Sequence, residues 1–75
     1  MAEPVECRSD LDYADTPLAF QWEGQRLLID EIVARWRTPQ GNFFRVRAAG
    51  NQLFELFYDE VNEEWHIHLL MVSSR

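Results

Sequence analysis

The sequence holds few side chains that could do chemistry, and the most suggestive are two histidines near its end. His66 and His68 are two positions apart, so on a β-strand both imidazoles would lie on one face, about 7 Å apart. Two imidazoles can share a metal ion, and Glu55 on a neighbouring strand could supply a third ligand. The set is incomplete, because the chain has no further histidine and a single cysteine, Cys7, which also has no partner for an internal disulfide. We therefore predict no metal site and no cofactor.

The hydroxyl nucleophiles are also poorly placed for catalysis. They lie in segments that we expect to be tails or turns, and no histidine or acid is expected beside any of them. These residues are Ser9, Thr16, Thr38, Ser73 and Ser74. A chain of 75 residues also lacks the room for a deep, dry pocket. We therefore predict that the protein is not an enzyme.

A cluster of arginines among aromatic residues is the stronger feature. Between Val33 and Ala49 there are four arginines and no acid. On adjacent strands these arginines would lie side by side, opposite the core, with two phenylalanines on the same face. We predict an interaction face that also includes the two histidines: Arg35, Arg37, Phe43, Arg45, Arg47, Phe57, His66 and His68.

Two interpretations of the arginines stay open. Arginines interleaved with exposed rings are typical of surfaces that bind single-stranded nucleic acid, through backbone charge and base stacking. In the other interpretation the arginines form a cross-strand ladder, in which Arg45 and Arg47 pair with Glu55 and Glu31.

Apolar side chains are expected on the same face as the arginines. Leu53, Leu70 and Met71 would join Phe43 and Phe57 in a patch, and a contiguous apolar patch usually marks a partner or dimer interface. Our leading prediction is a non-enzymatic protein-interaction module. The alternatives are a single-stranded nucleic-acid-binding domain that uses the same face, and a homodimeric structural domain.

The element that must position these residues is a β-hairpin over residues 42–58. Apolar and charged residues alternate over residues 44–48, and a second alternating run covers residues 53–58. Between them, Gly50 and Asn51 readily take the positive φ angles of a tight hairpin turn.

The flanking segments predict further strands. Residues 20–23 form a short strand, and residues 65–71 alternate as a last strand after an acidic turn. Residues 26–37 are ambiguous, because their apolar spacing suits an amphipathic helix, whereas a strand would need a bulge near Asp30. We favour a long, bent strand, because no good N-cap precedes the segment and the turn at residues 38–42 would fold it back on the hairpin.

The predicted fold is therefore all-β, a small antiparallel meander of about five strands that forms a curled sheet or SH3-like half-barrel. The alternative is an α+β fold in which residues 26–37 are helical. The predicted core consists of large apolar residues on the inner faces of the strands: Phe20, Trp22, Leu28, Ile32, Trp36, Phe44, Val46, Phe54, Leu56, Tyr58, Trp65, Ile67 and Leu69.

Charge and hydropathy divide the chain. The formal net charge is −6, and acids concentrate in residues 1–16, which lack hydrophobic periodicity. We predict an acidic N-terminal arm over residues 1–16, disordered or loosely docked, a single β domain over 17–72 and a frayed tail over 73–75. No apolar run approaches a membrane span and no signal peptide is evident, so we expect a cytoplasmic protein that does not bind membranes.

The spacing of the aromatic residues resembles that of a known family. The chain resembles a family of small bacterial domains of unknown function in this pattern: Phe20-x-Trp22-x-Gly24, Ile32 to Trp36-Arg37, Phe44-Arg45-Val46, Phe54-Glu55-Leu56-x-Tyr58-Asp59 and Trp65. Its members are often encoded beside error-prone DNA-polymerase and mutasome genes. The resemblance covers about residues 17–69 and implies a link to DNA repair or damage tolerance. It carries no activity and no functional residue with it.

Overall fold

The chain forms one antiparallel sheet in which each strand pairs with the next. The computed structural model describes residues 4–8 and 16–71. Its strands are β1 (Val5–Arg8), β2 (Thr16–Trp22), β3 (Gln25–Thr38), β4 (Gly41–Ala48), β5 (Gln52–Asp59) and β6 (Glu64–Met71). The sheet order is β1-β2-β3-β4-β5-β6, as in a meander. Across the described residues there is no helix long and apolar enough to cross a membrane.

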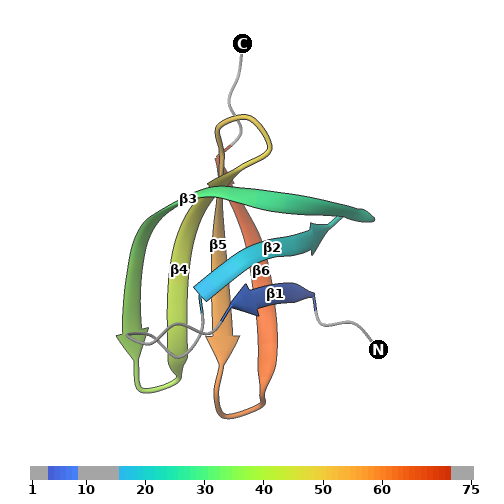
Figure 1. The fold of residues 1–75 in the computed structure, drawn as a ribbon. Coiled ribbons are helices and arrows are strands. Elements are labelled where there is room, and N and C mark those ends of the chain that lie inside the picture. The colour runs from blue at the N-terminus through green and yellow to red at the C-terminus, as the bar shows by residue number, and fades with distance from the viewer. Residues whose placement is uncertain (1–3, 9–15, 72–75) are drawn as a thin grey trace.

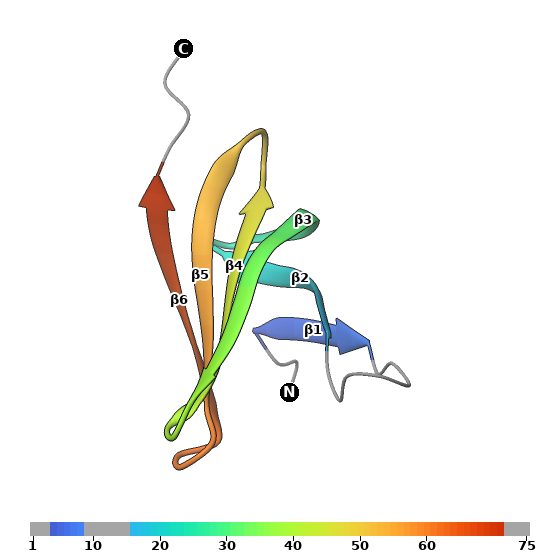
Figure 2. The ribbon, with the colours of Figure 1, turned by 90° about the vertical axis from the view of Figure 1, so that its left-hand side faces the viewer.

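The long strand β3 bends the sheet into two layers. Its first residues, 25–28, pair with β2, whereas residues 29–38 pair with β4. In Figure 1, β2 crosses in front of β5 and β6 and β1 crosses in front of β6, and Figure 2 shows β1 and β2 lying to one side of β4, β5 and β6. The prediction of an all-β curled half-barrel is confirmed, and the helical alternative for residues 26–37 is wrong.

Tight turns that contain residues with positive φ join several of the strands. Gly50 and Asn51 have positive φ between β4 and β5, as predicted for the central hairpin, and Ala49 has a positive φ as well. Glu23 and Gly24 do the same between β2 and β3. A two-residue turn of this kind, as between β2 and β3, twists in the sense that suits the flanking strands and so fixes the register of its hairpin.

The core lies between the two layers. Phe20 from β2 meets Phe54 from β5 edge to face, with ring centroids 4.8 Å apart, and Trp22 also packs on Phe54 with a centroid distance of 5.3 Å. The buried apolar residues are Val5, Ala19, Phe20, Phe44, Val46, Ala48, Phe54 and Leu56. Partly buried residues pack around them: Trp22, Leu27, Ile29, Ile32, Trp65 and Ile67.

Three of the predicted core residues are exposed rather than buried. Leu28 is 60% exposed, and Trp36 and Leu69 are also exposed. The two exposed residues in β3 are explained by two shifts of register against β4, one between Ile29 and Glu31 and one between Ile32 and Ala34. Each extra residue moves the following side chains to the opposite face of the sheet. A bulge near Asp30 was predicted, but the residues before it that reach the core are Leu27 and Ile29 rather than Leu28.

The first strand begins before the predicted domain start. We expected residues 1–16 to form an arm, but Val5–Arg8 pairs with β2 and Val5 is buried in the core. Arg26 donates two hydrogen bonds to the Glu6 carboxylate, at 2.6 and 2.8 Å, and these bonds lower the pKa of Glu6. The rest of the predicted arm, residues 1–3 and 9–15, and the predicted tail, residues 73–75, lie outside the described residues.

Asp59 organises the turn between β5 and β6. Its carboxylate accepts hydrogen bonds from the Asn62 side chain at 2.9 Å and from the backbone N–H groups of Asn62 and Val61 at 3.2 and 2.9 Å. These bonds, led by that of the Asn62 side chain, lower the pKa of Asp59. A carboxyl whose pKa is lower in the folded state stabilises the fold above its unfolded pKa, about 3.9, and loses that contribution as pH falls through the folded value.

We therefore expect Asp59→Asn to flatten the acid side of the stability curve. The parent protein loses stability as the pH falls below about 4, and the variant lacks the share that Asp59 contributes. Urea unfolding at a series of acidic pH values measures this difference. Asp30→Asn, at an exposed position in β3, serves as the control. Equal acid slopes for the parent and Asp59→Asn would show that Asp59 does not anchor the turn.

Candidate interaction surface

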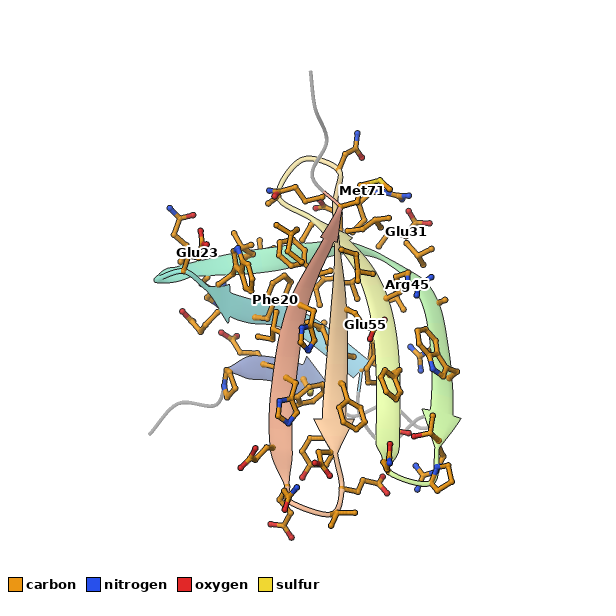
Figure 3. All side chains as sticks on the ribbon, turned by 180° about the vertical axis from the view of Figure 1, so that it is seen from behind. Phe20, Glu23, Glu31, Arg45, Glu55 and Met71 are labelled. Carbon is orange, nitrogen blue, oxygen red and sulfur yellow. The ribbon has the colours of Figure 1, made fainter. Side chains whose placement is uncertain are left out.

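The outer face of the sheet is the candidate site. We use this name for the side of β3 to β6 that points away from β1 and β2, which faces the viewer in Figure 3. Residues paired across antiparallel strands point to the same face, so the register places side chains in rows that cross the strands. Arg45 on β4 is paired with Glu55 on β5, and Figure 3 shows both on this side.

One row consists of four stacked rings, which we call the aromatic row. It is made of Trp36, Phe43, Phe57 and His66, one each from β3, β4, β5 and β6. The ring centroids of successive members are 5.2, 4.3 and 5.8 Å apart, with interplanar angles of 3°, 18° and 21°. The row therefore spans the whole width of this layer.

The rings in the row stand face to face rather than lying flat on the sheet. Two rings lying flat side by side would clash at a centroid distance of 4.3 Å, so the near-parallel rings of Phe43 and Phe57 must be stacked. The faces of these two central rings are covered by their neighbours in the row. Their edges, rather than their faces, are directed away from the sheet.

The next row carries charge. The Arg45 guanidinium lies 3.5 Å from the Glu55 carboxylate, and its carbon lies 5.3 Å from the centre of the Trp36 ring, in a cation–π contact. His68 follows Glu55 in the same row. Arg45 Nε is buried and has no hydrogen-bond partner among the described residues. The Arg45 side chain therefore contacts residues of both the charged row and the aromatic row.

The third row joins an ion pair to an apolar end. Arg47 pairs with Glu31, so the predicted ladder of Arg45 and Arg47 with Glu55 and Glu31 is present. Leu53 and Met71 continue this row across β5 and β6. Figure 3 shows Glu31 and Met71 at the same end of the sheet. Met71 is 60% exposed.

Two of the predicted face residues are on the other side of the sheet. Because of the bulges in β3, Arg35 is paired with Phe44, and its guanidinium lies 5.5 Å from the centre of that ring. Arg37 is paired with Asn42 and hydrogen-bonds to Asn42 and to Glu60. The structure therefore brings together six of the eight predicted residues, and the four arginines are divided between two faces.

Trp36 lies on the outer face, although the sequence predicted it to be a core residue. The turn after Trp36 indicates on which face of the sheet this residue lies. If Thr38 pairs with Gly41 across a two-residue loop, then Trp36 must face Phe43, which lies outside the core.

The histidines share the outer face, as predicted. His66 Nε2 lies 3.6 Å from a Glu64 carboxylate oxygen, and Glu55 is the cross-strand neighbour of His68. In the described part of the chain, no group of three or more histidine, cysteine or acidic side chains is placed to hold a metal ion.

Comparisons with known proteins do not assign the chain to a family. No family model matches the chain, no curated protein matches it, and no solved structure matches it. The resemblance to the small bacterial domain family therefore remains a prediction from the sequence.

Proposed function

We propose that this chain is a non-enzymatic protein-interaction domain that binds a protein partner through the outer face. The observation that carries the proposal is the aromatic row, which crosses four strands on the side of the sheet away from the core. Interfaces between proteins are enriched in aromatic residues and arginine, and depleted of unpaired charge at their centre.

The apolar part of the face extends beyond the aromatic row. Trp36 is 37% exposed at one side of the sheet, and Leu70 and Met71 are exposed at the end of β6. Leu53 on β5 lies directly beside Met71. A partner seated on the face would cover aromatic edges at its centre and aliphatic side chains at one end.

The charges on this face favour a protein over a nucleic acid. Arg45 and Arg47 are both paired with acids, so their charge is largely offset on the surface. Single-stranded nucleic acids are bound by unpaired cations and by open ring faces on which bases stack. The stacked Phe43 and Phe57 present edges instead, and the chain has a net charge of −6.

We expect the partner to be a cytoplasmic protein. The family resemblance directs the first search to proteins of DNA repair and damage tolerance.

The test is affinity capture with a face variant. In Arg45→Glu with Phe57→Ser, one charge of the face is inverted and the centre of the aromatic row is removed. We expect the tagged parent to retain one partner at both low and high salt, because an apolar interface responds little to ionic strength. The variant should lose that partner while its circular dichroism spectrum still shows a folded domain.

A matched control makes the same chemical changes on the other layer. Arg26→Glu with Leu28→Ser also inverts an ion-paired arginine and removes an apolar side chain, at exposed positions of β3 that pair with β2. This control should keep the partner. The proposal fails if the two folded variants capture the same proteins. Nucleic acid retained only at low salt would support the nucleic-acid alternative instead.

A further inference from the structure

The two sides of the sheet end in edges that differ in how well they are protected. An edge strand exposes unpaired backbone N–H and C=O groups, and proteins usually blunt such edges with bulges, short strands or charges. β1 is four residues long and has a shift of register between Glu6 and Cys7. The part of β3 beyond the β2 pairing carries two such shifts.

β6 is less protected, because its shift of register lies near its end, between the pairs Leu53–Met71 and Phe54–Leu69. It is eight residues long, and from Glu64 to Leu69 it pairs with β5 without a shift of register. In the described part of the chain, β6 is the end of the sheet and no strand pairs with its other side. Its inner side chains, Trp65, Ile67 and Leu69, are apolar rather than charged. This edge is therefore the one best suited to accept another strand.

We propose that a second copy of this chain pairs with β6, antiparallel, with His66 opposite His66 of the copy. The proposal goes beyond the partner-binding function and does not depend on it. A twofold axis perpendicular to the sheet would keep the two outer faces on the same side and join two six-stranded sheets edge to edge. Two rows of the outer face select this register.

The first row is the aromatic row. It ends on β6 at His66, whose ring stacks on Phe57 and whose side chain is 43% exposed. With His66 on the axis, the row of one copy continues into the row of the other. Stacked side chains directly opposite each other across strands stabilise the pairing.

The second row supplies complementary charge. In this register Glu64 of one copy lies opposite His68 of the other, at two symmetric places. Within one chain the row already alternates Arg45, Glu55 and His68, so an acid is the complementary next neighbour. An imidazole can donate a hydrogen bond to a carboxylate, and it gains a positive charge on protonation. Centring the axis on Ile67 would instead place His66 opposite His68 and Glu64 opposite Leu70.

The first experiment measures mass against concentration by analytical ultracentrifugation. We expect the 8.9 kDa chain to shift toward twice that mass as concentration rises. His68→Glu places like charges opposite each other at two sites and should weaken the dimer about tenfold. Glu64→Lys should weaken it as well, because it places a lysine opposite His68. The double variant Glu64→Lys with His68→Glu should restore dimerisation, which a merely structural role of either residue would not explain.

The second experiment tests the register by disulfide trapping in a Cys7→Ser background. His66→Cys places two thiols directly opposite each other, close enough for a disulfide to form. His68→Cys, on the same face, places them about 13 Å apart along the strands. We expect a covalent dimer from the first variant and none from the second. A chain that stays at 8.9 kDa at every concentration, no rescue in the double variant, or equal trapping at both positions would overturn the proposal.

Discussion

We expect Gly41→Ala to destabilise the protein more than Gly24→Ala or Gly50→Ala. Gly41 is buried at the start of β4, beside the end of β5. A Cβ at this position would overlap the carbonyl oxygen of Tyr58 and lie 2.9 Å from its carbonyl carbon and 3.1 Å from the Glu60 nitrogen. These are backbone atoms, so they cannot turn aside as a flexible side chain would. The β4–β5 pairing must open locally, and we expect a loss of about 3 kcal/mol or more.

Gly50→Ala is the control for this substitution. Gly50 also has a positive φ, at +73°, but a Cβ there would meet nothing within 4 Å. Its cost is the conformational one alone, about 1 kcal/mol. Thermal unfolding followed by circular dichroism distinguishes the two, because 1 kcal/mol corresponds to roughly 4–8 °C in a domain of this size. Equal melting temperatures for the two variants would mean that Gly41 does not sit against β5 as described.

Phe54→Ala is the second substitution with a large expected effect. Phe54 is fully buried and is the ring on which both Phe20 and Trp22 pack from the other layer. Removing a buried phenylalanine costs about 3–5 kcal/mol. The total stability of a 75-residue domain is roughly 4–11 kcal/mol at the usual value per residue. We therefore expect Phe54→Ala to unfold a measurable fraction of the protein at room temperature.

Phe57→Ala provides the comparison three residues away on the same strand. Phe57 is half-buried on the outer face and stacks on Phe43 and His66. Its loss removes stacking and part of the ring burial, about 1–2 kcal/mol, without leaving a cavity between the layers. Urea titration of the three proteins measures both effects. A larger loss for Phe57→Ala than for Phe54→Ala would contradict the assignment of the inner and outer faces.

The parts of the fold that could be predicted are those set by local chemistry. The 42–58 hairpin follows from a two-residue period and from Gly50 and Asn51, which accept the conformation of the turn. Once that hairpin is fixed, its alternation assigns Phe43, Arg45 and Phe57 to the outer face. These assignments depend on neighbours in sequence, so no tertiary information was needed.

The parts that could not be predicted depend on contacts between distant segments. The second bulge in β3 lies between Ile32 and Ala34, where no glycine or proline indicates a bulge in the sequence. It moves Arg35, Trp36 and Arg37 to the faces opposite those predicted. Its position depends on how β3 pairs with β2 at one end and with β4 at the other, and both partners are distant in sequence from part of β3. Strand β1 was missed for a similar reason, since its single core residue, Val5, lies in an acidic segment.

The rearrangement of β3 also changes what the outer face can do. With Arg35 and Arg37 on the inner side, the face is no longer a cluster of four cations. It consists instead of stacked rings bordered by paired charges, with aliphatic side chains at one end. This composition suits a protein surface better than a phosphate backbone.

The most direct test of the central claim is site-specific photo-crosslinking from the outer face in living cells. A photoreactive phenylalanine analogue replaces Trp36 in the aromatic row, and in a second protein it replaces Leu28, which is exposed on the other layer. If the outer face binds a protein, the probe at position 36 gives a discrete crosslinked partner and the probe at position 28 does not. The same partner crosslinked only from position 28, or nucleic acid alone from position 36, would contradict the account.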